Sequence, residues 1–481
     1  MSRRPGLRAL RLVLACSAVA LTACSSLDAA RIQGDRDVFG PTRITEHRGN
    51  DDLLTAGLGA EGLRAMTPPA FADATAPTPA ELRRRALWAN WRGIADLAPG
   101  GGYGTLYGST ATVAGREFSA FATLPGARQP HRVLVQVPDA FNLKRRCVVV
   151  TAASGSRGVY GAIAVAGAWG LPRGCAVAHT DKGAGTDYFD LDSGQGVRLD
   201  GTVGTPPEGL AFTPDVAAGD RGVAFKHAHS GDNPEADWGR HVKQAAEFAL
   251  QSLDTAFPQS APFTFDNTRV IAVGISNGGG AVLRAAELEG DWLDGVVAGE
   301  PNVLVEGHGS RALYDYTTQA ALLMPCALLH PALAPLPQPP LQAQVAPLWA
   351  AQCAALHKAG LVAGGDTAAQ AASAYEQLRA DGWTDEALRA GALSAGFDLW
   401  RSVAVTYAAA YTRAPVNALP CGYAYSAVDA AGKPRAATTA ERAAWWSDAS
   451  GIPPGAGVFA VAPPGSNPMT DLQCLRAMWT D

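Results

Sequence analysis

The sequence of 481 residues has few charged side chains, no excess of positive charge and no long uncharged apolar run. Only 17% of the residues are charged, 47% are hydrophobic, and the formal net charge is −5. This composition excludes a disordered chain, which needs low hydrophobicity, and gives nucleic acid no basic surface to bind. No segment recurs at a period of 20–50 residues, which excludes a solenoid. The length fits one large globular domain or two to three ordinary ones.

The first 24 residues have the pattern of an export signal. An apolar run, Leu12–Ala23, is too short to span a bilayer and follows a positive segment with Arg3, Arg4, Arg8 and Arg11. Leu21-Thr22-Ala23-Cys24 is similar to a lipoprotein box, in which the cysteine becomes the lipidated first residue. We expect residues 1–23 to be a signal peptide and the protein to be exported. Lipidation of Cys24 would make it a periplasmic or outer-membrane lipoprotein, and cleavage without lipidation would make it a free secreted protein. A buried N-terminal helix is the alternative.

Cysteine usage agrees with export. Two of the eight cysteines, Cys16 and Cys24, lie in the signal, and six remain: Cys147, Cys175, Cys326, Cys353, Cys421 and Cys474. Outside the cytosol an even set predicts disulfides, and six cysteines allow 15 pairings. Cys147 and Cys175 each open an apparent strand, so this pair could join neighbouring strands. No CxxC or Cys/His metal spacing occurs, so we expect no metal site built on these cysteines. We also expect no other cofactor.

The order of elements predicts an α/β core followed by a helical region. Residues 24–80 are expected to be an irregular segment or linker. In the core, residues 81–308, we expect helices at 81–95, 237–256 and 281–288, and strands at 118–124, 132–137, 147–151, 175–179, 269–273 and 295–299. Residues 183–236 have almost no periodicity and are expected to form a long loop. The strand–helix–strand rhythm at 269–299 indicates a parallel βαβ unit.

After residue 308 strands are expected to be absent. Helical spacing occurs at 348–359, 367–380, 384–395 and 399–410. We therefore expect residues 309–450 to be an α-helical cap, inserted after the strand at 295–299. Residues 451–481 would begin a return to the core, ending in a helix from 471.

The segment Gly274-Ile275-Ser276-Asn277-Gly278 matches the G-x-S-x-G nucleophile elbow and lies between a predicted strand and a predicted helix, as that motif requires. It predicts Ser276 as a catalytic nucleophile and the Asn277 N–H as one donor of an oxyanion hole. The second donor should follow the strand at 147–151, where the N–H groups of Ser154 and Gly155 are the candidates. The alternatives are a structural glycine-rich turn at 274–280 and a simple strand-to-helix turn at 152–156.

A triad histidine and acid cannot be assigned from the residues. The histidines after Ser276 are His308, His330 and His357, and none follows a buried strand with an aspartate before it. We expect each to be a surface or packing residue.

Other polar patterns carry less weight. Asp190-x-Asp192-x-Gly194 is only partly like a calcium loop, because its twelfth position is Gly201 and not Glu. His227 and His229 could share one face of an extended segment but lack a third ligand. His179 and Asp181 end a strand, where packing is the expected role.

Five segments form a distinctive set: Gly-Ile-Ser-Asn-Gly-Gly-Gly at 274–280, Val-Ala-His-Thr-Asp-Lys-Gly at 177–183, Lys-His-Ala-His-Ser at 226–230, Asn233-Pro234-Glu235, and Gly299-Glu300-Pro301-Asn302. Together they resemble the exported D-3-hydroxybutyrate oligomer hydrolases. The resemblance implies an α/β-hydrolase core (a mostly parallel sheet with a nucleophile elbow) and an inserted α-helical cap. It also implies a serine esterase that cleaves 3-hydroxybutyrate dimers and oligomers, small-molecule esters, downstream of polyhydroxybutyrate depolymerisation. The family nucleophile falls on Ser276.

The sequence departs from this family at its C-terminal end. Family members carry a further section with a strand leading to an aspartate and a loop with a histidine, and we expect the triad partners to lie there, beyond Asp481. Two other functions stay open. One is a tannase- or feruloyl-esterase-like hydrolase, and the other is a catalytically inactive truncated lipoprotein. The expected partners are a small ester substrate and no nucleic acid, with a membrane contact only through the N-terminal lipid.

Overall fold

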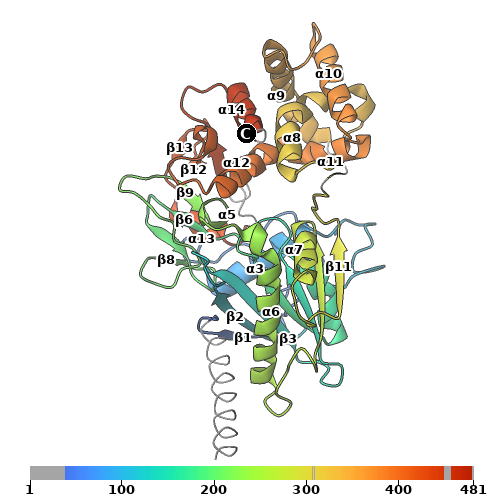
Figure 1. The fold of residues 1–481 in the computed structure, drawn as a ribbon, viewed down its shortest axis with the longest axis vertical. Coiled ribbons are helices and arrows are strands. Elements are labelled where there is room, and N and C mark those ends of the chain that lie inside the picture. The colour runs from blue at the N-terminus through green and yellow to red at the C-terminus, as the bar shows by residue number, and fades with distance from the viewer. Residues whose placement is uncertain (1–37, 306, 308, 338, 449–456, 479–481) are drawn as a thin grey trace, which may run out of the picture.

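The computed structural model describes residues 38–305, 307, 309–337, 339–448 and 457–478. The predicted signal at 1–23, the predicted lipidation site Cys24, and His308 lie outside these residues. The described chain forms an α/β core and a mostly helical cap, which Figure 1 shows stacked above the core.

A seven-stranded sheet forms the centre of the core. Its strands are β1 (Arg43–His47), β2 (Gly115–Ala122), β3 (His131–Pro138), β4 (Cys147–Ala152), β5 (Ala176–Thr180), β10 (Arg269–Ile275) and β11 (Gly295–Gly299), in the order β1-β2-β3-β5-β4-β10-β11. The four strands β5, β4, β10 and β11 pair in parallel. Parallel strands carry their functional loops at their carboxyl ends, and the loops after β4 and β10 therefore meet at one edge.

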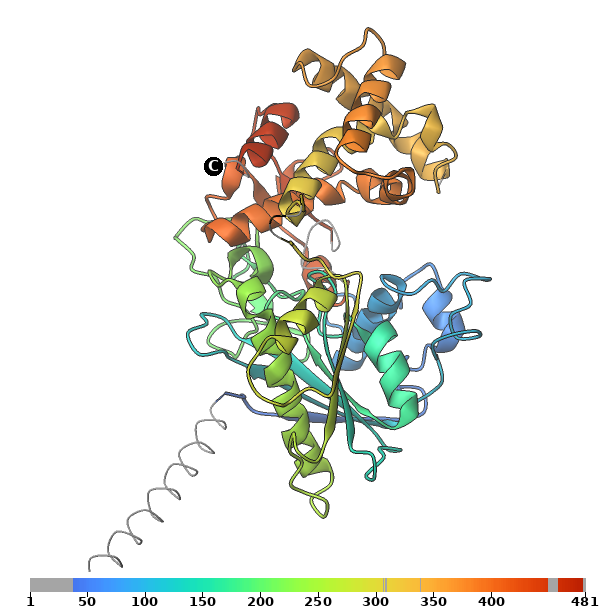
Figure 2. The same ribbon diagram turned by 45° about the vertical axis from the view of Figure 1, so that its right-hand side comes forward.

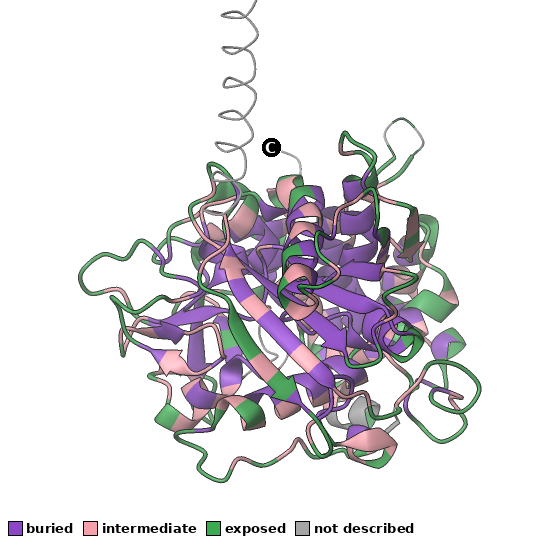
Figure 3. Cartoon of the chain, turned by 90° about the horizontal axis from the view of Figure 1, so that it is seen from below, coloured by how far each residue is buried: buried purple, intermediate pink, exposed green. Residues whose placement is uncertain are grey.

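Helices cover both faces of this sheet, as Figure 2 shows. Helices α6 (Pro234–Ala256) and α7 (Asn277–Ala286) pack against one face, and α3 (Pro79–Arg92) and the helical segment at 163–173 pack against the other. Strand β4 is buried throughout and alternates between the two cores, because successive side chains of a strand point to opposite faces. In Figure 3 the central strands are buried and the surrounding loops are exposed.

Two expectations for the core were wrong. Residues 24–80 are not simply irregular, since they supply the edge strand β1 and helix α2 (Gly59–Arg64). Residues 183–236 hold a four-stranded antiparallel sheet of β6 (Tyr188–Asp190), β7 (Gln195–Val197), β8 (Val203–Gly204) and β9 (Val223–Phe225), followed by α5 (Lys226–His229). Strands of two or three residues are too short to produce a readable alternation.

The cap contains α8 (Leu313–Ala327), α9 (Pro339–Lys358), α10 (Thr367–Ala380), α11 (Asp385–Gly396) and α12 (Leu399–Thr412). The last four confirm the predicted helices, although α9 begins nine residues earlier than expected. The expectation that strands end at residue 308 was wrong, because β12 (Ala424–Val428), β13 (Pro434–Arg435) and β14 (Val458–Val461) form a small antiparallel sheet. Helix α13 (Thr439–Trp445) lies between β13 and β14, and α14 (Pro468–Ala477) follows β14.

Three disulfides join the six cysteines that were expected to pair. Cys147–Cys175 connects the starts of β4 and β5, as the sequence suggested, and the others are Cys326–Cys353 and Cys421–Cys474 in the cap. Within the described ranges, none of the helices combines the length and the apolar character that a membrane crossing requires.

Candidate active site

Ser276 stands at the turn between β10 and α7 with a strained backbone. Its φ of 56° and ψ of −125° lie in a region that residues other than glycine rarely adopt, and holding such a conformation costs about 1–3 kcal/mol. Its N–H donates to the Gly299 carbonyl over 2.9 Å, which ties the turn to the end of β11. The side chain is half-buried at the carboxyl edge of the sheet.

Two glycines make this turn sterically feasible. A Cβ on Gly274 would lie 2.2 Å from the Gly278 carbonyl oxygen, and a Cβ on Gly278 would lie 2.5 Å from the Ala152 carbonyl oxygen. Both distances are well inside van der Waals contact with backbone atoms. The second also shows that the end of β4 lies directly against the first turn of α7.

The candidate oxyanion donors meet on this edge. The Asn277 N–H is at the positive N-terminal end of α7, and Ser154 and Gly155 follow the neighbouring strand β4. Gly155 has a φ of +54°, and a Cβ placed on it would meet no atom within 4 Å. The loop therefore presents an open side next to the elbow.

A cap residue reaches this edge. Tyr407 on α12 accepts a hydrogen bond from the Asn277 side-chain amide over 3.1 Å, and its ring lies edge-on to His227 with centroids 5.0 Å apart. The His227 ring is buried and hydrogen-bonds the Ser156 hydroxyl. Burial lowers the pKa of His227 to about 3, so this ring is neutral at ordinary pH. His227 and His229 lie on the short helix α5 and not on the extended segment that was expected.

The buried ammonium of Lys182 and the partly buried carboxyl of Glu235 complete the cluster. The Lys182 ammonium donates to the Gly155 carbonyl, and Glu235 at the start of α6 accepts from the Tyr411 hydroxyl over 2.9 Å. Burial lowers the pKa of Lys182 to about 8 and raises the pKa of Glu235. Sequence reasoning gave no role to Lys182, Glu235 or Tyr407. Lys182 and Glu235 lie within segments that carry the family resemblance, whereas nothing in the sequence distinguished Tyr407.

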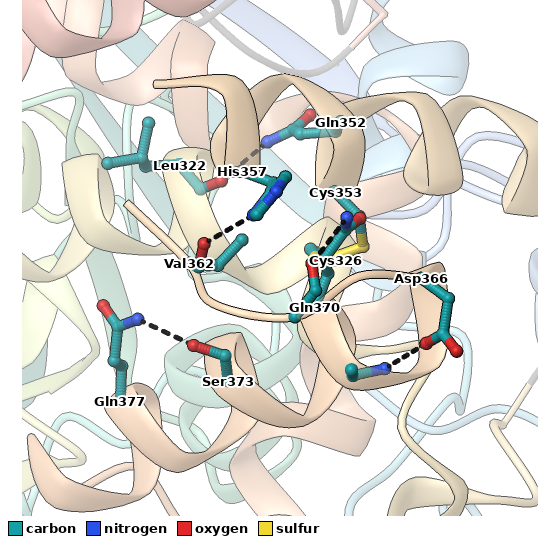
Figure 4. Close-up of a disulfide and its surroundings, with 12 residues drawn as sticks. Leu322, Cys326, Gln352, Cys353, His357, Val362, Asp366, Gln370, Ser373 and Gln377 are labelled. Carbon is teal, nitrogen blue, oxygen red and sulfur yellow. Dashed lines mark hydrogen bonds between the residues drawn. A yellow bond between two sulfur atoms is a disulfide. The ribbon is translucent and has the colours of Figure 1, made fainter. Parts of the chain in front are cut away.

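Three other histidines within the described residues, His357, His330 and His179, have structural partners. His357 donates from Nδ1 to the Val362 carbonyl beside the Cys326–Cys353 disulfide (Figure 4), and His330 stacks on Tyr375. His179 is buried and bonds Gln136.

The two acidic candidates are likewise held by protein groups. Asp181 accepts the Arg132 N–H, and Asp190 pairs with Arg442 across 3.3 Å. Throughout the part of the chain that the structure describes, no three His, Cys, Asp or Glu side chains gather as a metal ion would require.

An open groove of about 840 Å³ runs beside α7. Glu235 and Tyr411 line it near the cluster, and Gly280 lies one helical turn beyond Ser276. Leucines, alanines and Val303 form much of its wall. Its charged lining is mixed, because Arg284 pairs with Glu287, Arg311 pairs with Asp315, and Glu235 also lines the groove. Its size falls within the usual range of ligand sites.

Comparisons with known proteins place the chain in a family. Residues 20–473 match the family model of the 3HB-oligomer hydrolases (3HBOH). The D-(-)-3-hydroxybutyrate oligomer hydrolase of Cupriavidus metallidurans is 41% identical over 467 residues, which are 87% of this chain and 64% of that protein. The protein of the same name from Burkholderia vietnamiensis is 38% identical over 538 residues, covering 98% of this chain and 77% of that protein.

Among solved structures, feruloyl esterase B from Aspergillus oryzae matches with a TM-score of 0.27 and 15% identity, over 45% of this chain and 32% of that chain. A likeness this slight supports no conclusion. The family match, by contrast, spans nearly the whole sequence and agrees with close relatives at about 40% identity. The chain therefore belongs to the 3HB-oligomer hydrolase family.

Proposed function

We propose that this chain is a serine carboxylesterase that hydrolyses short oligomers of 3-hydroxybutyrate, with Ser276 as the nucleophile of an α/β-hydrolase core. The strained backbone of Ser276 carries the proposal, because such a conformation persists only where the surrounding structure enforces it, and it clusters at active sites. The glycines around the turn support it, as do the related proteins, which are named 3-hydroxybutyrate oligomer hydrolases.

The proposed chemistry is acyl transfer through Ser276. The hydroxyl oxygen attacks the ester carbonyl, and the resulting oxyanion accepts hydrogen bonds from the Asn277 N–H and from the N–H of Ser154 or Gly155. Collapse of this intermediate breaks the ester bond and releases the first product, whose freed hydroxyl takes up a proton, while the acyl part stays on Ser276. Water then hydrolyses the acyl-enzyme and releases the acid.

The proton from Ser276 needs a general base. Within the described residues, the Ser276 side chain makes no capping hydrogen bond. His227 hydrogen-bonds the Ser156 hydroxyl, and burial lowers its pKa to about 3, which makes it a weak base. We propose that the triad histidine and acid lie outside the described residues. In serine hydrolases, removal of such partners lowers kcat by several orders of magnitude, and the oxyanion hole together with substrate binding retains about 10³–10⁴-fold catalysis over water. That residual rate is measurable with sensitive esters.

The groove beside α7 suits an oligoester chain that is uncharged except for one terminal carboxylate. Its apolar wall would contact the methyl-bearing backbone of the oligomer, and Arg284 or Arg311 would attract the terminal carboxylate.

The direct test is hydrolysis of 3-hydroxybutyrate dimer and trimer by the purified chain, with monomer measured by chromatography. We expect monomer release that is lost in Ser276→Ala. Release that persists in Ser276→Ala would refute the nucleophile assignment. Turnover of aromatic esters without dimer cleavage would favour a tannase-like enzyme, and inertness toward every ester would favour a non-catalytic lipoprotein.

We also propose export as a lipoprotein. The support is the arginine-rich and apolar N-terminal pattern together with three disulfides, which form outside the cytosol. In a bacterial host, wild-type chain should incorporate radiolabelled palmitate and Cys24→Ala should not. Equal labelling of the two would contradict lipidation at Cys24, and retention of the full-length chain in the cytosol would contradict export.

A further inference from the structure

The loop after β4 is fixed by contacts on its inner side. Its carbonyl at Ala152 lies against Gly278 of α7, and the Ala153 N–H donates to the Thr180 carbonyl of β5 over 2.9 Å. The loop therefore rests on both neighbouring strands. Beyond Ala153, the backbone leaves the sheet and turns at Gly155, where the side facing away from the protein is open.

The ammonium of Lys182 contacts this turn, and within the described residues no other lysine ammonium does. Its ammonium donates to the Gly155 carbonyl, and its side chain is 1% exposed. The Lys182 backbone has a φ of +49°, unusual for lysine, and its N–H donates to the Thr180 hydroxyl over 3.0 Å. The end of β5 thus holds Lys182 in a defined, unfavourable conformation that aims it at the loop.

Other elements complete the surroundings of this ammonium. It lies 5.4 Å from the Trp238 ring centroid on α6, a cation–π arrangement. The carboxyl groups of Asp181 and Glu235 attract it. Burial nevertheless lowers the Lys182 pKa to about 8, because the desolvation of the ammonium outweighs the attraction of the two carboxyl groups.

Glu235 connects the same ammonium to the elbow. It accepts from Tyr411 and interacts with Tyr407, and Tyr407 in turn accepts from the Asn277 amide. Asn277 and the Gly155 loop are the two sides of the proposed oxyanion hole. One polar network therefore contacts both sides and includes the cap helix α12.

We propose that Lys182 is a positioning residue for the oxyanion hole, holding the Gly155 peptide so that the loop after β4 faces the Ser276 elbow. This role rests on the proposed esterase function. The peptide group is planar, so the ammonium fixes the orientation of the Gly155–Ser156 peptide. Only the φ and ψ rotations of Gly155 join this plane to the Ser154–Gly155 peptide, which carries the candidate Gly155 N–H, so holding the first peptide limits the movement of the second. Without the ammonium, the Gly155 carbonyl loses its charged donor and the loop can rotate away from the developing oxyanion.

Lys182→Met tests this role, and Lys243→Met is a matched control. Lys243 on α6 also donates to a backbone carbonyl, that of Glu289, and also lies near an indole ring, that of Trp292 at 5.8 Å, but it contacts nothing in the site. The measurements are kcat and KM for a fluorogenic butyrate ester, the inhibition constant of a boronic acid, and the melting temperature.

We expect Lys182→Met to lower kcat about 10–100-fold with KM within about twofold, because a misplaced oxyanion donor acts on the transition state. Boronate affinity should fall in parallel, Lys182→Arg should recover part of both, and Lys243→Met should match wild type. If Lys182→Met does not fold, Lys182→Gln takes its place with the same expected loss.

Wild-type kcat and boronate affinity in a folded Lys182→Met or Lys182→Gln variant would overturn the positioning role while leaving the esterase assignment intact. Equal losses in Lys182→Met and Lys243→Met would also overturn it. A wild-type chain that turns over no ester and binds no boronate would refute the esterase assignment, and the positioning role with it.

Discussion

Replacement of Gly278 by alanine tests the contact between the elbow and the loop after β4. The added Cβ would lie 2.5 Å from the Ala152 carbonyl oxygen, so one of the two backbones must move by roughly 1 Å to restore an ordinary contact. Overpacking of this kind costs about 1–3 kcal/mol of unfolding free energy. Because the displaced segment carries the proposed oxyanion donors, a shift of about 1 Å should lower kcat/KM by about 10²-fold.

Gly295→Ala is the matched control for this substitution. Gly295 lies on β11 of the same sheet, and the nearest atom to its added Cβ is the Ile271 Cγ2 at 4.0 Å. Guanidinium unfolding followed by circular dichroism gives the stability, and a fluorogenic ester gives the rate. We expect the control to keep both at wild-type values. A Gly278→Ala variant with wild-type stability and rate would show that the two backbones are not in the close contact described above.

Three further outcomes follow from the structure. Arg284→Gln should raise KM about 3–10-fold for a hydroxybutyrate trimer but not for its methyl ester, because only the acid offers a carboxylate to this half-exposed guanidinium. The ion pair of Arg284 with Glu287 contributes little stability, so the variant should fold normally. Equal KM changes for both substrates would contradict this prediction. Replacing both Cys147 and Cys175 by serine should lower the unfolding free energy by about 2–4 kcal/mol, since the disulfide closes a loop between residues 28 positions apart; an unchanged denaturation midpoint would count against it. Stability should fall as the pH drops below about 4.5, because burial alone would raise the pKa of Glu117 but the contacting Arg83 holds it well below that ordinary value. The stabilisation from the ionised Glu117 is therefore complete above the unfolded pKa and is lost as the pH falls through the folded pKa. Glu117→Gln should flatten this acid slope, and an unchanged slope would refute the assignment to Glu117.

The sequence predicts best those elements whose local pattern is continuous. The run at 147–151 is β-branched and uninterrupted, and it lies within the buried central strand β4. The helix at 237–256 carries an apolar stripe at helical spacing and corresponds to α6. The elbow combines a strand, a glycine-flanked serine and a helix in sequence order, so its local geometry follows from a few adjacent residues.

The missed features depend on contacts between distant segments. Strands β6 to β9 are two or three residues long and exist because they pair with one another. Tyr407 reaches Asn277 across 130 sequence positions, and the Lys182 contact with Gly155 spans 27. No local periodicity encodes such pairings, because they arise only when the cap packs above the sheet and when β4 and β5 lie side by side.

The most direct test of the nucleophile is the site of covalent modification by a fluorophosphonate. Wild-type chain and Ser276→Ala are incubated with the reagent, and the adduct is mapped by peptide mass spectrometry. Our account predicts a single adduct on Ser276 in the wild type and none in the variant. An adduct on another residue, an adduct that persists in Ser276→Ala, or an unmodified wild-type chain after prolonged incubation would contradict it.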